Sequence, residues 1–450
     1  MEEKAPPSGE MPKPAPKGRG LWIGIAVVVI VVAVLLVAVF AGWLAPPTQP
    51  PPGPTEDEIL KIGTVFPLTG GLAAFGPDGE RAARLAVEEI NEAGGVLGQP
   101  VELYTADSKT DAAAGRDAAT ALIQTSRVDA IVGAYGSGIS ASVLQVAIAN
   151  EVVQVSPAST SPIFSNHSFD QDWFFRTAPS DALQGVVAAH YAYENRSFRQ
   201  VAVIGINNPY GNGLATVFET TFESLGGTIT KKLIIPEAQT DYTGTLTDLW
   251  DGPEPAPEAV YFVAYPDTGV QLMSDWWTNR AGWPTEWVFS EGLRDQTLYV
   301  DELVTRGIDV STFEGSSPVS PSGAQYDAFV SRYMAEYPGD TPTLFASNAY
   351  DAVYMIALAA EKAGVAAGPE IKAQMLGISR PPGTTVVPGP AGWSAALNVT
   401  GDVDYEGASG SLNWDEFGDP TSSYEIWAMD QSNQIFQKEF FSEATVLGWL

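Results

Sequence analysis

The chain has no cysteine among its 450 residues and only two histidines, His167 and His190. The missing thiols exclude disulfides, thiolate nucleophiles, Cys-ligated zinc, iron–sulfur clusters and a lipidated Cys as a membrane anchor. Neither histidine lies in a zinc-protease or triad-like signature, so we expect both to be ordinary surface or interface side chains. The chain therefore offers little for an enzyme that depends on sulfur or imidazole chemistry.

Positive charge is also scarce, with 23 Lys and Arg against 54 Asp and Glu, which gives a formal net charge of −31. A nucleic-acid partner is not expected, because phosphates need clustered Lys and Arg. The same shortage argues against docking on an anionic membrane surface. Hydrophobic residues make up 45% of the chain, which is enough for a core, and the length allows two or three domains.

One long hydrophobic run stands near the start, at residues 21–45, and it carries no charge over 25 positions. As a helix it would be about 37 Å long, which is enough to cross a bilayer with some tilt. A cleaved signal peptide is the alternative. We favour a retained single-pass anchor, because the run is longer than a usual signal-peptide core and Pro46 and Pro47 follow it.

The flanks of this run set its expected orientation. Residues 1–20 carry a net charge of +1, and the next positive residue after the run is Lys61. The excess of positive charge predicts a cytoplasmic tail at 1–20 and an extracellular body that carries about −32. Residues 46–58 begin with six prolines in nine positions and predict a semi-rigid linker between the membrane and that body.

From residue 59 the pattern changes to short apolar runs that alternate with segments of helical spacing. This alternation predicts a doubly wound α/β layer, and it restarts after Phe198, which indicates two such lobes with a cleft between them. The stretch 365–410 is rich in Gly, Pro, Ser and Thr and is expected to be mostly irregular. Residues 411–419 are expected to form a strand running into a turn. The strands are expected at 59–66, 101–106, 128–134, 152–155, 201–206, 228–235, 259–264 and 287–289, and the helices at 79–93, 111–124, 140–149, 213–225, 270–280 and 346–363.

Glycines cluster in GAYGSG, residues 133–138, between an expected strand and an expected helix. Their spacing is not that of a dinucleotide site, and the chain has no Gly-Lys-Ser/Thr phosphate loop, so no nucleotide or other cofactor is expected. A tight loop that presents backbone N–H groups and a Ser hydroxyl to an anion fits better. The acidic sequence WDEFGD at 414–419 lacks the spacing of a calcium loop and predicts a solvated turn. Asn166, Asn195 and Asn398 each begin a possible glycosylation sequon.

Several segments together resemble one protein family. Residues 61–111, which begin KIGTVFPLTG, are followed by VDAIVGAYGSGIS, VVQVSPASTSP, FFRTAPSD, VAVIGINNPYGNGLA, AVYFVAYPDTG, VFSEGL, ASNAYDAV and YEGASGSLNWDEFGDP. These segments resemble the leucine/isoleucine/valine-binding family of solute-binding proteins, over about residues 59–430. The resemblance implies a type I periplasmic-binding fold, made of two doubly wound α/β lobes with a three-crossing hinge. It also implies a protein that is not an enzyme and that delivers a solute to the permease and ATPase subunits of an ABC importer.

The resemblance also places ligand-binding residues one at a time. Ser137 matches the serine that holds the α-carboxylate of the ligand, and Thr160 matches a threonine that meets both its carboxylate and its ammonium. The Ala158 carbonyl is a further acceptor, and Glu291 matches the acid that pairs with the ammonium. Aromatic positions around the ligand match Phe75, Tyr210, Tyr265 and Tyr350. Phe75 replaces a Tyr that is common in the family and so lacks that contact.

Elementary chemistry agrees with this assignment, because a zwitterionic amino acid needs donors for its carboxylate and a carboxylate for its ammonium. Ser137 and Thr160 follow expected strands of one lobe and Glu291 follows a strand of the other, so a bound ligand would bridge the lobes and favour closure. Each assignment has an alternative that remains open. Ser137 and Thr160 are alternatively helix-capping residues. Glu291 is alternatively a solvated acid of a loop, and the aromatic residues are alternatively part of the core.

The family layout predicts lobe 1 at 59–180 and 317–405, and lobe 2 at 181–316 and 406–450. We expect a membrane-anchored receptor for an α-amino acid, leucine-like ligands first. The alternative is a sensor or receptor subunit for an amino acid, an amide or a small aromatic acid. With only about 20 cytoplasmic residues, such a sensor would act through a partner chain.

Overall fold

The computed structural model describes residues 59–250, 256–279 and 286–450. The expected cytoplasmic tail, membrane anchor and Pro-rich linker at 1–58 lie outside these residues. Within them, no helix combines the length and the apolar character needed to cross a membrane.

Lobe 1 is built on a five-stranded parallel sheet with the order β2-β1-β3-β4-β5. Its chain first alternates strand and helix as the sequence pattern predicts. The first-pass elements are β1 (Lys61–Phe66), α2 (Gly76–Glu92), β2 (Glu102–Asp107), α3 (Ala112–Ala121), β3 (Ala130–Gly133), α4 (Ser137–Ala149), β4 (Val153–Ser156), α5 (His167–Asp170) and β5 (Phe174–Arg176).

The side chains of the central strands alternate between two separate cores. Ile62 and Phe66 of β1 belong to the large core with α2, whereas Val65 belongs to a second core with α3 and α4. Because successive residues of a strand point to opposite faces, a strand that is apolar throughout needs a helical layer on both faces. This is why the short apolar runs of the sequence form a sheet between two helical layers.

Lobe 2 contains a seven-stranded sheet with the order β15-β14-β10-β9-β8-β6-β7. The strands from β6 to β10 are parallel, and β14 and β15 add an antiparallel edge. Its elements are α6 (Asp181–His190), β6 (Gln200–Ile206), α7 (Pro209–Ser224), β7 (Thr228–Ile235), α8 (Thr243–Trp250), β8 (Ala259–Val263), α9 (Pro266–Asn279), β9 (Glu286–Phe289), α10 (Asp301–Thr305), β10 (Glu314–Pro318), β14 (Tyr424–Met429), β15 (Ile435–Phe441) and α15 (Glu443–Leu447).

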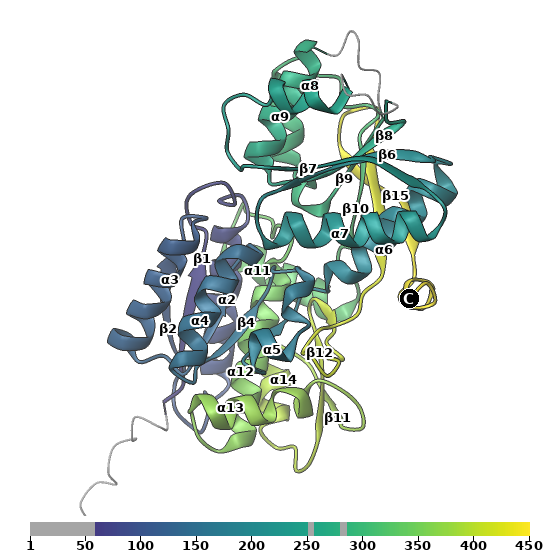
Figure 1. Ribbon diagram of the computed structural model, residues 1–450. Helices are drawn as coiled ribbons and strands as arrows, with labels where there is room; N and C mark the ends of the chain where they lie inside the picture. The colour runs from purple at the N-terminus through teal and green to yellow at the C-terminus, as the bar shows by residue number, and fades with distance from the viewer. Residues whose placement is uncertain (1–58, 251–255, 280–285) are drawn as a thin grey trace, which may run out of the picture. The chain divides into compact units, whose positions relative to one another are not determined.

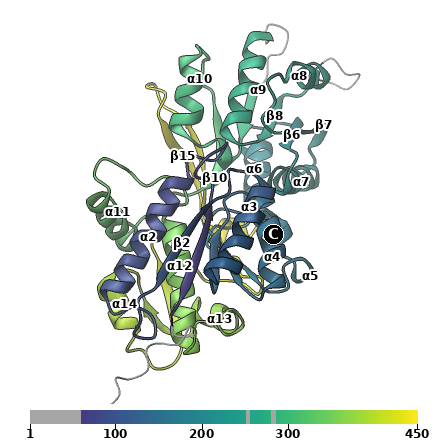
Figure 2. The same ribbon diagram turned by 90° about the vertical axis from the view of Figure 1, so that its left-hand side faces the viewer.

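Between β10 and β14 the chain returns to lobe 1. Figure 1 shows these late green elements in the same lobe as the purple and blue ones, and Figure 2 shows α2, α12 and α14 together, in agreement with the packing of α2 on α12 and α14. The chain therefore passes between the lobes three times, after β5, after β10 and before β14. The returning elements are α11 (Ala324–Glu336), α12 (Ala346–Ala363), α13 (Gly368–Met375), β11 (Thr384–Val386), α14 (Pro390–Ala396), β12 (Val403–Gly407) and β13 (Gly410–Ser411).

Three expectations need correction in this returning part. The stretch 365–410 is not mostly irregular, because α13, β11, α14 and β12 lie in it. The expected strand at 411–419 is reduced to β13, because Glu406 and Gly407 pair with Ser411 and Gly410 in a tight hairpin. The expected lobe boundaries at 316/317 and 405/406 would cut β10 and β12, so the strand pairing places both boundaries later in the chain. Abundant Gly and Pro hid these short elements, which packing rather than propensity stabilises.

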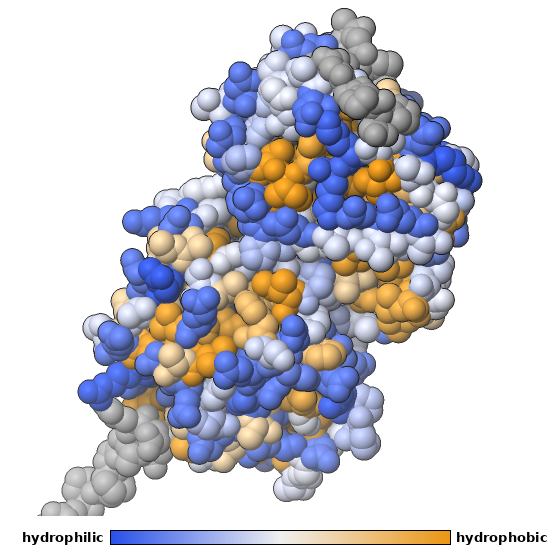
Figure 3. Space-filling model, in the orientation of Figure 1, coloured by the Kyte–Doolittle hydropathy of each residue, from blue (hydrophilic) through white to orange (hydrophobic). Residues whose placement is uncertain are grey.

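The exposed residues of the described part of the chain are mostly hydrophilic. Figure 3 shows mostly hydrophilic residues on the viewed face, with smaller hydrophobic areas between them. Helix α12 shows the opposite character, because every residue from Ala346 to Ala360 is buried. A helix that is buried on all sides gives no sign in its sequence of which face meets which neighbour.

Candidate functional site

A narrow cavity lies where the carboxyl ends of strands from both sheets meet. In a parallel sheet these ends share one edge, and the loops that leave them gather the side chains of a binding site. Lobe 1 contributes the segments that follow β1, β3 and β4, and lobe 2 those that follow β6, β8 and β9. The lining residues are Leu72, Phe75, Tyr135, Gly136, Ser137, Ala158, Thr160, Tyr210, Tyr265, Glu291, Gly292, Leu344 and Phe345.

The structure brings seven of the eight predicted site residues together at this cavity: Phe75, Ser137, Ala158, Thr160, Tyr210, Tyr265 and Glu291. Tyr350 is the exception, and its prediction as a ligand neighbour is corrected here. The Tyr350 hydroxyl donates a hydrogen bond to the Glu89 carboxylate inside lobe 1. The same hydroxyl accepts a hydrogen bond from the Arg332 guanidinium at 3.0 Å. In its place, Leu344 and Phe345 from the segment before α12 line the cavity.

The GAYGSG loop holds Ser137 at the cavity wall. Gly136 has a φ of +87°, and a Cβ there would lie 3.2 Å from Leu72 and 3.3 Å from the Tyr265 hydroxyl. Glycine is therefore needed at this bend. Ser137 is the first residue of α4 rather than a loop residue, so this helix begins three positions earlier than expected.

The Ser137 hydroxyl does not cap its own helix, which removes that alternative. No side chain caps α4. The Ser137 Oγ instead accepts a hydrogen bond from the Ser161 N–H at 3.2 Å. An accepting hydroxyl keeps its own hydrogen, so Ser137 can still donate to a ligand in the cavity.

A group of buried serines fixes the segment that carries Ala158 and Thr160. The carbonyl of Ala134 accepts hydrogen bonds from Ser156 at 2.7 Å and from Ser159 at 3.1 Å. The Ser156 hydroxyl in turn accepts from the Ala158 N–H at 3.3 Å. The loops after β3 and β4 are thus joined by hydrogen bonds at the point where they meet the cavity.

Glu291 supplies the acid of lobe 2, at the start of the short 3-10 turn that follows β9 (Glu291–Leu293). It is 4% exposed, and its carboxylate accepts a hydrogen bond from the Gln184 side-chain amide at 2.6 Å. Burial raises its pKa to about 7, and the Tyr210 hydroxyl and Gln184 amide oppose this rise. Gly292 keeps the turn close to lobe 2, because a Cβ there would lie 2.4 Å from the Ala264 carbonyl.

Asp181 is a second buried acid, and the sequence reasoning missed it. It is fully buried at the first position of α6, and neither carboxylate oxygen has a hydrogen-bond partner among the described residues. Burial raises its pKa well above the usual value and the negative charge of Glu291 adds to the rise, whereas the nearby Thr160 hydroxyl and the positive charge of Arg176 oppose it. Its backbone N–H donates to the Thr160 carbonyl at 2.7 Å, which joins it to the cavity wall.

A Ser-Asp pair before an apolar helix resembles an ordinary helix start, which explains the omission. Ser180 does cap α6 by accepting from the Ala182 N–H. A more telling signal is the helix itself, because all but one of its residues are buried. An acid that begins such a helix has little access to water.

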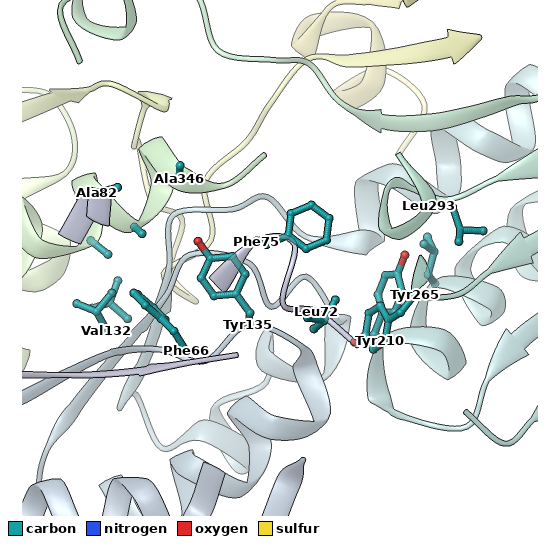
Figure 4. Packing of buried hydrophobic residues seen from close by; sticks show 14 of the residues in the cluster. Phe66, Leu72, Phe75, Ala82, Val132, Tyr135, Tyr210, Tyr265, Leu293 and Ala346 are labelled. Carbon is teal, nitrogen blue, oxygen red and sulfur yellow. The ribbon is translucent and has the colours of Figure 1, made fainter. Parts of the chain in front are cut away.

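Aromatic and aliphatic side chains form the rest of the wall. The rings of Tyr210 and Tyr265 stack with centroids 5.3 Å apart, and the Tyr210 hydroxyl donates to Ser290 at 2.8 Å. Figure 4 shows Leu72 and Phe75 between Tyr135 on one side and this tyrosine pair on the other. The cavity thus has donors at one part of its wall, the acid Glu291 at another and an apolar remainder.

A wider hollow borders the cavity and shares Gly136 and Tyr265 with it. Its wall is polar and includes Lys109, Glu237 and Asp267. Ser161 donates to the Pro209 carbonyl at 2.8 Å, a direct hydrogen bond between residues of the two lobes. The hollow therefore places charged side chains beside the narrow, largely apolar cavity.

Comparison with known proteins gives consistent matches over this region. A family model described as periplasmic binding protein matches residues 59–401. The Leu/Ile/Val-binding protein BraC3 of Rhizobium johnstonii is 30% identical over 324 residues, which cover 72% of this chain and 84% of that protein.

Solved structures show the same fold. LivJ of Streptococcus pneumoniae, a branched-chain amino acid transporter substrate-binding protein in complex with isoleucine, aligns with a TM-score of 0.68 and 24% identity, over 85% of this chain and 99% of that one. A solute-binding protein of an ABC transporter from Rhodopseudomonas palustris, in complex with 4-hydroxybenzoate, aligns with a TM-score of 0.68 and 17% identity, over 87% and 99%.

Proposed function

Because the chain belongs to the periplasmic binding protein family, we propose that it binds an α-amino acid between its lobes and delivers it to an ABC permease. Leucine-like amino acids are the first candidates. The family consists of substrate-binding proteins of transport rather than enzymes, so the ligand leaves unchanged.

One observation carries the choice of an amino acid: Glu291 at the cavity wall and Asp181 close to it are two buried acids without a cation between them. The side-chain groups that act on Glu291, the Gln184 amide and the Tyr210 hydroxyl, are neutral, and neither carboxylate forms an ion pair with a cation among the described residues. Buried carboxylates are costly unless they are paired with a positive charge. The ammonium of an α-amino acid supplies that charge, whereas benzoate-like acids would add a third negative group.

The opposite wall suits the α-carboxylate. Ser137 lies at the N-terminus of α4, where the helix dipole and free N–H groups favour an anion. Thr160 is 2% exposed and lies in the segment held by the serine hydrogen bonds. We assign Ser137 and Thr160 to the carboxylate, and Glu291, Thr160 and the Ala158 carbonyl to the ammonium, with Asp181 adding negative charge behind them.

The remaining wall selects the side chain of the ligand. Leu72, Phe75 and Phe345 present carbon atoms, and the hydroxyls of Tyr210 and Tyr135 are engaged with Ser290 and with the Phe345 carbonyl. An aliphatic side chain loses nothing in such surroundings, whereas a charged one would lack a partner. This favours leucine, isoleucine and valine over polar amino acids.

The matched relatives suggest that the protein works as part of an ABC importer, together with permease and ATPase subunits. We propose further that residues 21–45 tether the protein to the membrane with its binding domain outside. The support is the 25-residue run without charge. Carbonate extraction of membranes tests the tether: the full chain should stay in the pellet, and a chain lacking 1–58 should be released.

A thermal-shift screen against the twenty amino acids tests the ligand class. Ligand that binds only the native state raises its stability by about 2.7 kcal/mol at a hundredfold excess over Kd. We expect the largest rise in Tm with leucine, isoleucine or valine, and none with benzoate or urea. A rise with benzoate and none with any amino acid would overturn the proposal.

A further inference from the structure

A second group of chemically active side chains lies away from the cleft, at the short helix α5. The imidazole of His167 and the carboxylates of Asp170 and Asp172 each place a ligand atom within 4.8 Å of the other two. His167 Nδ1 lies 2.6 Å from an oxygen of Asp172, and both side chains are about half exposed. None of the three residues lines the ligand cavity.

Asp170 distinguishes this group from an ordinary cluster of surface acids. It is only 1% exposed, and its Oδ2 has no hydrogen-bond partner among the described residues. The other oxygen of Asp170 accepts a hydrogen bond from the Asp172 N–H at 3.1 Å. A buried carboxylate oxygen without a donor is costly, and a bound cation would remove that cost.

The surroundings hold the group in place. The His167 ring packs on Phe417 with centroids 4.6 Å apart, and Phe417 belongs to the 415–419 turn, which the buried Arg176–Asp419 pair fixes to lobe 1. Asp170 and Asp172 line a hollow of lobe 1 together with Phe417 and other residues, so an ion can reach them. The three side chains are therefore held by the 415–419 turn, and Asp170 and Asp172 face the hollow.

We propose that His167, Asp170 and Asp172 form a binding site for a divalent transition-metal cation, with Zn²⁺ as the first candidate. One imidazole nitrogen and two carboxylate oxygens match the ligands that Zn²⁺ takes, with water completing the shell. Ligand atoms around tetrahedral Zn²⁺ lie about 3.3 Å apart, because each bond is about 2.0–2.2 Å long. To admit the ion, the exposed side chains of His167 and Asp172 separate from 2.6 Å, and any ligand atoms that lie as far as 4.8 Å apart move closer together.

The competing interpretation is a plain His–Asp ion pair beside a buried acid. Lys372 also lines the hollow, but its ammonium donates to the Gln171 carbonyl at 3.0 Å, so a protonated His167 would then be the cation nearest to Asp170. A high negative charge also attracts cations without any site. The experiment must therefore separate one defined site from diffuse attraction.

The two histidines of the chain provide the readout. We expect Zn²⁺, added to the full chain, to shift the NMR signals of the His167 imidazole in a saturable 1:1 titration. His190 is buried and stacked on Trp449, and it should not respond. Equal responses of both imidazoles, or no saturation at His167, would overturn the proposal.

Calorimetry with matched variants completes the test. His167→Gln and Asp172→Asn should each weaken Zn²⁺ binding at least about tenfold, and Asp117→Asn, at an acid 78% exposed on α3, should leave it unchanged. Asp170→Asn should raise the Tm of the metal-free protein, since it removes a buried charge, and abolish the rise in Tm that Zn²⁺ causes. Zn²⁺ binding that survives in Asp170→Asn and His167→Gln would show diffuse attraction only and contradict the site.

Discussion

Two pairs of buried ionisable groups lie close to the same cavity wall, and they differ in whether the protein supplies the cation. Arg176 and Asp419 form a complete ion pair, in which the guanidinium Nε and Nη2 each donate at 2.6 Å to a different carboxylate oxygen. Asp181 and Glu291 are two acids that raise each other's cost of ionisation. We call Arg176 and Asp419 the closed pair, because their charges already compensate each other. We call Asp181 and Glu291 the open pair, because they lack a cation that a ligand can supply.

Every N–H donor of Arg176 is used within the protein. Besides Asp419, the guanidinium donates to the carbonyls of Ser159 and Ser161 and to the Ser165 hydroxyl, at 3.0–3.1 Å. These contacts fix the residues on both sides of Thr160. The comparison teaches that a buried charge with all its partners serves structure, whereas a buried charge that lacks its counter-charge indicates a ligand.

The largest expected effect comes from breaking the closed pair. Arg176→Met should lower the free energy of unfolding by about 3–5 kcal/mol, because Asp419 remains buried without its cation. Urea unfolding measures this. Arg306→Met, at an exposed pair with Glu302, is the matched control and should change stability by less than about 0.5 kcal/mol. Equal effects of the two variants would show that burial does not distinguish these pairs.

Breaking the open pair should affect the ligand instead of the fold. Glu291→Gln should weaken leucine binding by about 2–5 kcal/mol, because the ammonium loses its buried counter-charge. The ligand-free protein should be as stable as the wild type or more stable, since one buried acid is gone. Glu237→Gln, at an acid of the wider hollow, should change the affinity by less than about 0.5 kcal/mol. Unchanged affinity in Glu291→Gln, measured by calorimetry, would refute the assignment of Glu291.

The open pair also predicts opposite pH dependences for stability and for binding. Burial raises the pKa of Glu291 from its usual 4.5 to about 7, so over this range the folded protein keeps a proton that the unfolded chain has released. Stability of the ligand-free protein should therefore fall as the pH rises from about 4.5 to 7 and then level off. Leucine affinity should rise over the same range, because the ammonium needs the ionised carboxylate. Glu291→Gln should flatten the affinity curve and reduce the fall in stability, to which the raised pKa values of Asp170 and Asp351 also contribute. Curves that keep their shape would contradict the assignment.

The smallest effect is expected at Tyr350, which is buried in lobe 1 and does not line the cavity. Tyr350→Phe removes the hydroxyl that bonds the Glu89 carboxylate, so it should lower the free energy of unfolding by about 1–2 kcal/mol. Leucine affinity should stay unchanged, because the side chain lies outside the cavity. A loss of affinity larger than the loss of stability would return Tyr350 to the binding site.

The alternating pattern of the sequence predicted β1 to β4 and β6 to β9, because a parallel strand buried on both faces is expected to be apolar. It missed β5, β10, β14 and β15. Expected and observed limits agree for β7, at 228–235, and for α12, at 346–363. The pattern failed in the returning part of lobe 1, where α13, β11, α14 and β12 are short and rich in Gly and Pro. Such elements are stabilised by the lobe on which they pack, and their own residues carry little signal.

The site could be predicted where a residue follows a strand, since the carboxyl ends of parallel strands share one edge. The family resemblance placed Ser137, Thr160 and Glu291, their positions after strands agreed with it, and the structure brings all three to the cavity. Tyr350 was misplaced because α12 is buried on all sides, and its sequence does not say which face meets the cavity. Asp181 was overlooked because an acid at a helix start is usually solvated, and only the three-dimensional burial reveals its cost.

The central claim is that the ligand supplies the cation that Asp181 and Glu291 lack. The most direct test compares leucine with 4-methylpentanoate, which has the same side chain and carboxylate but no ammonium, in parallel calorimetric titrations at pH 8. The account predicts that leucine binds and that 4-methylpentanoate binds more weakly by about 2–5 kcal/mol, a difference that Glu291→Gln reduces. Equal affinity for the two ligands in the wild-type protein would contradict it.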